Sequence, residues 1–135
     1  MDSGHPHVEV ARRLTEAFAA RDRPTIEELI AEECIWRVPG DNLLSGVYVG
    51  RPAVLELFGR IRSLFDGPIQ FDVLDIAVGD RGAAVYQYAS GMVSGRPVRM
   101  KECLVYTIVD GRVVELDEFQ FDLRSFDEAF ARRSA

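Results

Sequence analysis

Four long strand-like segments, separated only by short turns, dominate the second half of the sequence. They are rich in β-branched and aromatic side chains, which favour strands. The last turn between them contains Asp110-Gly111, a pair typical of tight β-hairpins. Strands connected in this way pair with their neighbours, so this half predicts an antiparallel meander. The segments span residues 69–78, 83–93, 98–109 and 113–121.

The first half is predicted to be mostly helical. Apolar residues recur at helical spacing over Val8–Arg21. A capping-box spacing begins a second helix at Thr25, and a proline in the first turn begins a third after Gly50. A short strand is expected at Ile35–Val38. A last helix begins at Ser125, with Asp122 as an alternative cap. Helices followed by a strand meander define an α+β fold with an antiparallel sheet.

Length and charge restrict the classes of protein that this chain can represent. Its 135 residues fit a single domain, residues 1–135. Sixteen basic against 22 acidic residues give a net charge of −6, so neither nucleic acid nor an anionic membrane is an expected partner. No apolar run is long enough to span a membrane, and no secretory signal pattern is visible. We expect a cytoplasmic protein.

The residues that usually build metal and nucleophile sites are scarce. The two histidines, His5 and His7, lie in a predicted tail, so a histidine metal site or a catalytic triad is not expected. Cys34 and Cys103 belong to no CxxC pair and are expected to be reduced core residues. No phosphate-binding or dinucleotide-binding loop is present, so no cofactor is expected. Chemistry must therefore depend on carboxylates, tyrosines, amides and the shape of a pocket.

Glu102 is the strongest anomaly in the strand pattern. Residues 98–109 alternate, with Met100, Leu104 and Tyr106 on one face. Arg99 lies on the other, which is therefore the solvated face. Glu102 shares the covered face, where a carboxylate is costly unless it is paired, hydrogen-bonded or lining a wet cavity. The alternatives are that strand twist or a bulge turns Glu102 to solvent, or that an arginine pairs with it as a structural partner.

The last strand allows two orientations. Simple alternation favours burial of the phenylalanines and exposure of Glu118. In the other orientation Glu118 lines a polar pocket, and the phenylalanines meet a partner subunit. Trp36 is expected to face inward on its short strand, more as a core residue than as a platform for a ligand. The two faces of the last strand are Leu116, Glu118 and Gln120 on one side, and Asp117, Phe119 and Phe121 on the other.

Three segments carry a resemblance to a known family. They are Ala31-Glu32-Glu33-Cys34-Ile35-Trp36-Arg37-Val38-Pro39-Gly40, Ser45-Gly46-Val47-Tyr48-Val49-Gly50 and Val109-Asp110-Gly111-Arg112-Val113-Val114-Glu115. With the order of elements, they make residues from about 7 to 135 resemble the nuclear transport factor two-like superfamily, in its SnoaL-like branch of polyketide cyclase-like and ketosteroid isomerase-like proteins. The resemblance implies a cone, in which a curved antiparallel sheet wraps around the long third helix, with N-terminal helices, a central apolar pocket and a homodimer.

The family contains several activities as well as non-catalytic binding proteins, so the fold is a weak guide to function. In related cyclases and epoxide hydrolases, an acidic residue of the final strand projects into the pocket. Glu118 falls near that position, where the family more often has Asp. The epoxide-hydrolase pattern requires an Arg beside an Asp, and Asp117-Glu118 has no adjacent Arg. No set of residues matches the isomerase pattern convincingly.

Three functions follow as hypotheses. The first is a cofactor-independent enzyme that cyclises or isomerises an apolar carbonyl compound, with Glu118 as the base and Glu102 or a tyrosine as hydrogen-bond donor. The second is a non-catalytic pocket for a small apolar metabolite. The third is a protein-interaction module that uses Val105, Phe119 and Phe121 on the outer sheet face. The expected pocket residues are Trp36, Tyr48, Phe58, Met100, Tyr106 and Gln120.

Overall fold

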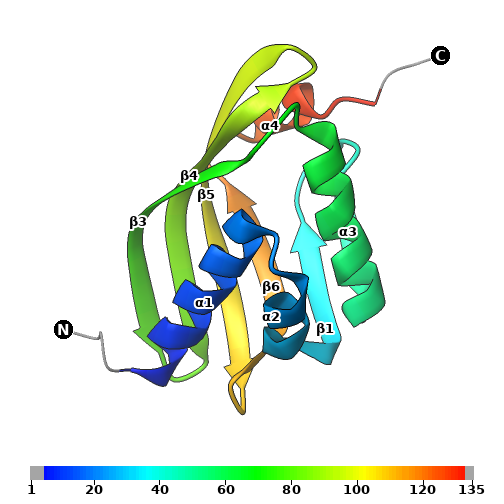
Figure 1. Cartoon of the computed structure of the whole chain (residues 1–135). Helices are drawn as coiled ribbons and strands as arrows, with labels where there is room; N and C mark the ends of the chain where they lie inside the picture. Colours follow the sequence, from blue (N-terminus) through cyan, green and yellow to red (C-terminus); the bar gives the residue numbers. More distant parts are fainter. Residues whose placement is uncertain (1–4, 133–135) are drawn as a thin grey trace.

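A computed structural model of the chain describes residues 5–132 and contains four helices and six strands within them (Figure 1). None of the described helices is long and apolar enough to cross a membrane. The elements are α1 (Pro6–Ala20), α2 (Arg23–Leu29), β1 (Ile30–Val38), β2 (Gly46–Val49), α3 (Arg51–Leu64), β3 (Gln70–Gly79), β4 (Gly82–Val93), β5 (Arg96–Val109), β6 (Arg112–Gln120) and α4 (Leu123–Ala129).

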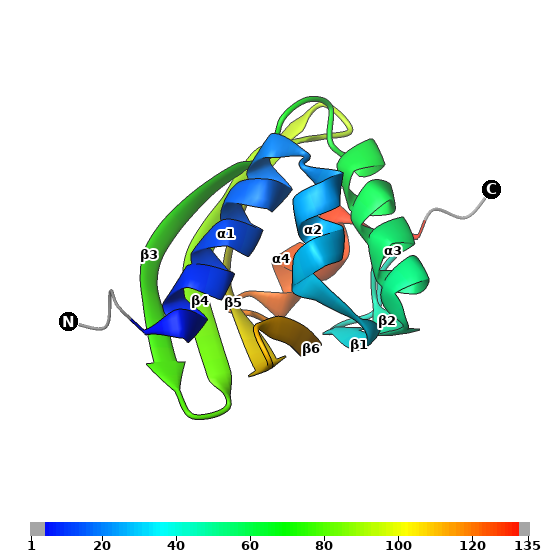
Figure 2. The ribbon, with the colours of Figure 1, turned by 60° about the horizontal axis from the view of Figure 1, so that its bottom comes forward.

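The six strands form one curved sheet in the order β2-β1-β6-β5-β4-β3. The predicted meander is confirmed, because β3 to β6 pair consecutively and antiparallel. The sheet differs from the expectation at one position, where β1 pairs parallel with β6. No hairpin connects these two strands, so the local turn chemistry that fixes direction elsewhere does not act on this pair. Figure 2 shows α1, α2 and α3 across the inner side of the curve.

α4 and the β4–β5 hairpin lie at the same end of the molecule (Figure 1). Two features shape that end. A register shift between Val73 and Asp75 breaks the regular pairing of β3 with β4, as a β-bulge does. On β4, a Cβ at Gly91 would lie 2.7 Å from Cδ1 of Phe65, so the glycine allows that ring to pack against the strand.

The predicted start of α2 was wrong by a few residues, because its N-cap is Asp22 and not Thr25. Of the two caps that the sequence offers for the last helix, Asp122 is the N-cap of α4 and Ser125 is not. Each aspartate accepts a hydrogen bond from the backbone N–H three residues later, at 3.2 and 3.0 Å, and a second one from the hydroxyl of the same residue. These bonds favour the charged form and lower the pKa of both carboxyls.

The predicted inner face of β5 is confirmed, whereas simple alternation on β6 was misleading. Glu102, Leu104 and Tyr106 are all buried. On β6, Leu116 is fully buried, and Phe119 is 57% exposed on the opposite face. The antiparallel register determines this orientation. Cross-strand partners point to the same side of a sheet, and Leu104 pairs with Glu118. The two exposed phenylalanines therefore follow from pairing with β5, which the sequence of β6 alone does not reveal.

Candidate active site

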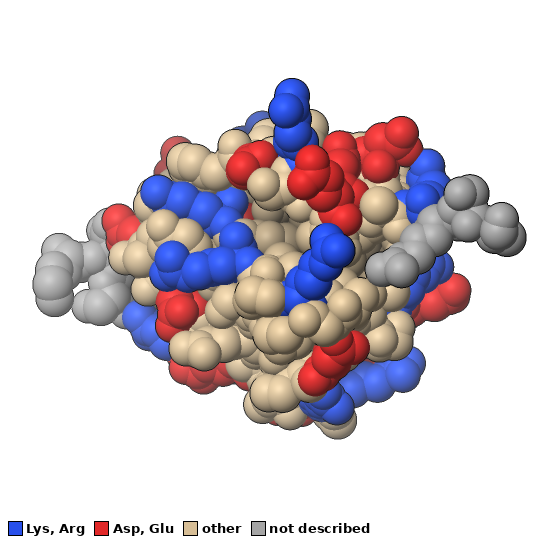
Figure 3. Space-filling view, turned by 90° about the horizontal axis from the view of Figure 1, so that it is seen from above, with Lys and Arg blue, Asp and Glu red and all other residues tan. Residues whose placement is uncertain are grey.

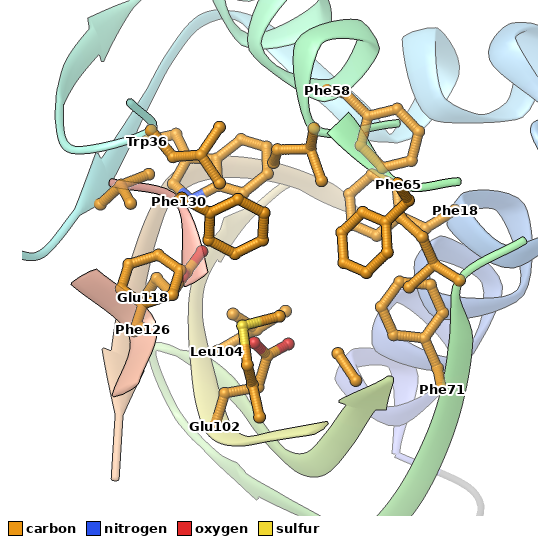
Figure 4. A pocket seen from close by; sticks show the side chains of 16 residues that line it. Phe18, Trp36, Phe58, Phe65, Phe71, Glu102, Leu104, Glu118, Phe126 and Phe130 are labelled. Carbon is orange, nitrogen blue, oxygen red and sulfur yellow. The ribbon is translucent and has the colours of Figure 1, made fainter. Parts of the chain in front are cut away.

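The inner face of the sheet and the helices enclose one apolar cavity (Figure 4). The space open to the centres of water-sized molecules is about 60 Å³, so the cavity is narrow. Aromatic and aliphatic side chains make almost the whole wall, and Glu102 and Glu118 are the charged residues among them. The lining consists of Phe18, Trp36, Val38, Leu44, Phe58, Ile61, Phe65, Ile69, Phe71, Ala89, Met100, Glu102, Leu104, Glu118, Phe126 and Phe130.

The two glutamates are connected through one amide. Gln120 Nε2 donates to Glu102 Oε1 and to Glu118 Oε2, both at 2.9 Å. Gln87 Nε2 donates to the second oxygen of Glu102 at 2.8 Å. Glu102 therefore receives an N–H on each carboxyl oxygen, whereas Glu118 receives one from the bridging amide. This asymmetry gives the two carboxyl groups different chemical environments.

Strand register brings these four polar side chains together from three strands. Glu102 on β5 lies opposite Gln87 on β4 and opposite Gln120 on β6. Glu118 lies two residues before Gln120 on the same face of β6, because side chains alternate along a strand. The cluster is thus a row across the centre of the sheet. Glu102 is 6% exposed and Gln87 is 1% exposed, whereas Glu118 and Gln120 are half-buried, so the β4 and β5 part of the row is the least hydrated.

Burial shifts the protonation of both carboxyls. Desolvation raises the pKa of Glu102, and the two amide donors oppose that rise. Desolvation and the charge of Glu102 raise the pKa of Glu118 to about 8. Two carboxylates so close together in a dry cavity resist being ionised at once. At neutral pH the pair therefore holds a proton, and the hydrogen bonds favour Glu118 as its carrier.

Trp36 brings an indole N–H next to this pair. The indole interacts with the Glu118 carboxyl and favours its charged form. Nevertheless its Nε1 has no hydrogen bond of acceptable geometry within the described residues, although Trp36 is 4% exposed. We regard the indole as close to Glu118 but misaligned with it. Figure 4 shows the nitrogen-bearing edge of Trp36 on the same side of the cavity as Glu118.

The predicted pocket residues divide into three groups. Trp36, Phe58 and Met100 line the cavity. Gln120 contributes by holding the two glutamates. Tyr48 and Tyr106 lie outside the lining. The Tyr48 hydroxyl donates to the Leu44 carbonyl at 2.8 Å, and the Tyr106 phenol is buried, which raises its pKa.

Two site features were missed in the sequence. Gln87 is a polar residue on the alternating inner face of β4, between Val85 and Ala89, and this pattern was visible. The contribution of α4, which places Phe126 and Phe130 in the cavity wall, had no comparable signal. Both rings pack edge to face, with centroids 5.6 Å apart.

The histidines have structural positions at the start of α1. His5 Nδ1 accepts a hydrogen bond from the His7 N–H at 3.1 Å, and the His7 ring lies 3.0 Å from the Gly79 carbonyl. Neither residue lines the cavity. Within residues 5–132, no group of three or more His, Cys, Asp and Glu side chains is arranged to hold a metal ion.

A wider cleft, here called the upper cleft, lies outside the cavity between the β4–β5 hairpin and α4. It shares Met100 and Phe126 with the cavity lining, so it adjoins the cavity. Both charge signs line it, with Arg96 and Lys101 on β5 and Glu128 on α4. Figure 3 looks down on this end of the molecule and shows basic and acidic side chains around the centre.

The curved sheet and its enclosed cavity define a nuclear transport factor two-like cone, also called a cystatin-like fold. An NTF2-like protein from Burkholderia xenovorans has this fold, with a TM-score of 0.79 at 18% identity, covering 96% of this chain and 99% of that one. The model of the SnoaL-like domain family matches residues 11–116. The chain therefore belongs to the SnoaL-like family. The match contains Trp36 and Glu102 and ends before Glu118.

Two further structures are similar over nearly the whole chain. Bal32a, from a soil-derived mobile gene cassette, has a TM-score of 0.88 at 28% identity, covering 93% of this chain and 96% of Bal32a. IdmH of Streptomyces antibioticus, a proposed polyketide cyclase, has a TM-score of 0.74 at 23% identity, covering 92% of this chain and 98% of IdmH. At this identity IdmH supports the fold alone, so function must be argued from the site.

Proposed function

We propose that this protein is a cofactor-independent acid–base enzyme that isomerises or cyclises a small apolar carbonyl compound. The carboxyl pair carries this proposal, because Glu102 and Glu118 lie in one apolar cavity and share the amide of Gln120. One group that holds a proton beside one that accepts a proton is the minimum equipment for moving hydrogen between carbon and oxygen.

The hydrogen bonds support an assignment of roles opposite to the one expected from the sequence. Two amide N–H groups stabilise the Glu102 carboxylate, which makes it the base. Glu118 has a pKa raised to about 8 and is the proton donor at neutral pH. Gln120 acts as a positioning residue, since it fixes the two carboxyl groups relative to each other.

The proposed step is proton transfer next to a carbonyl group. A Glu102 oxygen takes a proton from the carbon adjacent to the carbonyl, while Glu118 donates its proton to the carbonyl oxygen. The product is an enol, with Glu102 now protonated and Glu118 ionised. Return of the proton to another carbon gives an isomer, and attack of the enol carbon on a second carbonyl closes a ring. Exclusion of water by the aromatic wall strengthens both interactions.

Exchange of hydrogen for deuterium tests this step without knowledge of the natural substrate. Small cyclic and linear ketones are incubated with the protein in D₂O, and loss of the adjacent C–H signals is followed by NMR. We expect acceleration over buffer for ketones that fit the narrow cavity. Glu102→Gln should lower the exchange rate by about 100-fold or more, since general-base catalysis is worth about 10²–10⁴.

Asp117→Asn is the matched control, because Asp117 follows Leu116 on β6 but faces outward, where it pairs with Arg37. Its exchange rate should equal that of the unchanged protein. Exchange rates in Glu102→Gln and Glu118→Gln that equal the rate of the unchanged protein would contradict the proposed mechanism. A ketone that binds but shows no exchange would favour the second candidate, a binding protein, which the almost wholly apolar wall supports.

We also propose a homodimer in which the outer face of the sheet forms the contact. Phe119 and Phe121 are 57% and 62% exposed on this face, where isolated monomers rarely place neighbouring rings. Phe119→Glu should raise the dimer dissociation constant at least about tenfold, since the interface would bury an unpaired charge. Sedimentation velocity over a range of concentrations measures this. A monomer at every concentration would contradict the proposal.

A further inference from the structure

The cavity contains acidic groups without any basic partner. Its lining includes Glu102 and Glu118 but no Lys, Arg or His. Neither glutamate forms an ion pair within residues 5–132, and every hydrogen-bond donor to them is a neutral amide. Buried carboxylates are ordinarily paired with a cation. The proton that the pair holds at neutral pH offsets one of the two charges, and a ligand is the remaining source of positive charge for the other.

The walls beside the two carboxyl groups suit a cation as well. Trp36 and Phe126 both line the cavity with Glu118, and Phe18 stacks on Phe58 with ring centroids 4.5 Å apart. Aromatic faces attract cations, and aromatic cages are a recurrent way to recognise ammonium groups. Figure 4 shows the carboxyl groups of Glu102 and Glu118 turned toward the space that the labelled rings surround.

We propose that this cavity binds small apolar amines as their ammonium ions, paired with Glu102 and Glu118, and rejects carboxylate-bearing compounds of the same shape. This function goes beyond the proposed carbonyl chemistry and does not depend on it. An anion would meet two carboxyl groups without a basic residue to offset them. The upper cleft has charges of both signs, so it distinguishes cations from anions less than the cavity does.

Binding should release a proton. The free pair holds one proton, and an ammonium ion beside it favours the doubly ionised form. The proton leaves to solvent, so the complex contains two carboxylates and one cation where the free site had one carboxylate and one carboxylic acid. Among the elements packed against Glu118, β5 contributes Glu102 and the Tyr106 phenol, β1 contributes Trp36 and α4 contributes Phe126. Of these, Glu118 is the group whose raised pKa, about 8, lies near the pH range of the measurement.

The pH dependence follows from the order of these states. Below a pKa of about 8, an ammonium ion must displace the proton of Glu118, so the apparent affinity falls as the pH falls. The affinity should change by about tenfold per pH unit in that range and level off above it, because one proton is released per ligand. A neutral ligand of the same shape should show no such slope.

Three compounds of one shape test the charge preference: benzylamine, benzyl alcohol and benzoate. Trp36 is the only tryptophan of the chain and lines the cavity, so its fluorescence reports binding directly. Titrations at several values from about pH 6 to about pH 9 keep benzylamine protonated for most of the range. Calorimetry of benzylamine in two buffers with different ionisation enthalpies counts the protons released.

We expect benzylamine to bind at least about tenfold more tightly than benzoate at pH 8. Glu118→Gln should lose the pH slope and bind benzylamine, at every pH, with the weak affinity that the unchanged protein shows near pH 6. Glu102→Gln is a second variant and should weaken benzylamine binding as well. Asp117→Asn, an outward carboxyl on the same strand, should leave both the affinity and the slope unchanged.

Three results would overturn the inference. They are benzoate binding as tightly as benzylamine, a flat pH profile in the unchanged protein, and a slope that persists in Glu118→Gln. Thermal unfolding of each variant, followed through Trp36, confirms that the fold is intact. The ketone exchange assay stays independent, because absence of exchange leaves charge-selective binding untouched, and absence of amine binding leaves exchange untouched.

Discussion

The two faces of the β5–β6 hairpin differ in their charged groups and in their surroundings. On the inner face, Glu102 and Glu118 lie among aromatic rings and receive only amide donors. On the outer face, the Lys101 Nζ lies 4.9 Å from the ring centroid of Phe121, and Arg99 lies over the Tyr88 ring at 3.6 Å. Neighbouring residues of the same strand therefore lie in different environments, one apolar and one aqueous.

The charges on the outer face stabilise the fold, whereas the charges on the inner face do not. The outer cations remain hydrated at their tips while their stems cover aromatic surface, so their presence costs little. The inner carboxyls lose hydration, and this desolvation raises the pKa of both. A pair that destabilises the fold is expected where it performs a function, since nothing in the packing of the sheet requires it.

The two faces should differ most in the loss of unfolding free energy when one side chain on each face is shortened to alanine. Leu104 is 5% exposed and lines the cavity, whereas Val105 next to it faces outward. Leu104→Ala should lower the free energy of unfolding by about 2–5 kcal/mol, because it removes buried methyl groups and leaves a hole. Val105→Ala should cost less than about 1 kcal/mol. Urea unfolding followed by Trp36 fluorescence measures both, and equal losses would contradict the assignment of the two faces.

The pH dependence of stability should come next in size. The pKa of Glu118 rises from 4.5 to about 8 on folding, so the folded state binds this proton more tightly than the unfolded state. Its contribution is complete below the unfolded value and is lost as the pH rises through about 8. Stability should therefore fall between about pH 5 and about pH 8, by an amount of the order of a few kcal/mol.

Glu118→Gln should flatten this profile and raise the melting temperature near pH 8, because the amide has no proton to lose. Asp117→Asn, on the outer face of the same strand, should keep the slope of the unchanged protein. Thermal unfolding at fixed ionic strength gives the comparison. A profile that rises between pH 5 and pH 8 would mean that other groups dominate the linkage.

The sequence predicted the meander and one of the two faces well, for physical reasons. Strand lengths and turns are local properties, and the alternation along β5 is by itself enough to place Glu102 on the covered face. The orientation of Glu118 is different. Its strand carries both apolar and polar residues on each face, and only pairing with Leu104 decides between them. Register is a long-range property, so local alternation could not supply it.

The rest of the site could not be predicted from the sequence, because it depends on contacts between distant segments. The parallel pairing of β1 with β6 brings Trp36 beside Leu116, 80 residues later. The placement of α4 depends on a polar contact with the loop after β1, in which Asn42 is fully buried. No periodic pattern encodes either of these. Tyr48 was expected in the pocket from residue type, which carries no information about direction. Alternation placed Tyr106 on the correct inner face, but its ring lies outside the cavity lining.

Removal of the contact between α4 and the loop after β1 should lower stability by an intermediate amount, because this contact helps to cover only the inner face. Asp127 Oδ1 accepts from the Asp41 N–H at 2.8 Å and from Asn42 Nδ2 at 2.9 Å. Asp127→Ala leaves the buried amide of Asn42 without its acceptor and should cost about 1–3 kcal/mol. It should also increase the fluorescence of a hydrophobic dye that enters the cavity. A loss of stability without added dye binding would mean that α4 stays closed by its phenylalanines alone.

The smallest effect should come from the outer cations. Lys101 lies over the rings of Tyr86, Tyr88 and Phe121, at distances of 5.3, 5.8 and 4.9 Å from their centroids. At an exposed site this arrangement is worth about 0.5–1 kcal/mol, so Lys101→Gln should lower stability by no more than that. Lys101→Arg retains the charge and should restore most of it.

Repeating this stability measurement at several protein concentrations shows whether the outer face is solvated or covered by a second chain. A cost near 1 kcal/mol that is the same in dilute and concentrated samples describes a solvated face that acts only within one chain. If the cost of Lys101→Gln grows with concentration while the cost of Leu104→Ala does not, the outer face is covered by a second copy of the chain. The comparison between the faces would then be between two buried environments, one closed around a ligand site and the other closed by assembly. In that case the outer cations contribute to the association of two chains, whereas the inner carboxyls still face an apolar cavity.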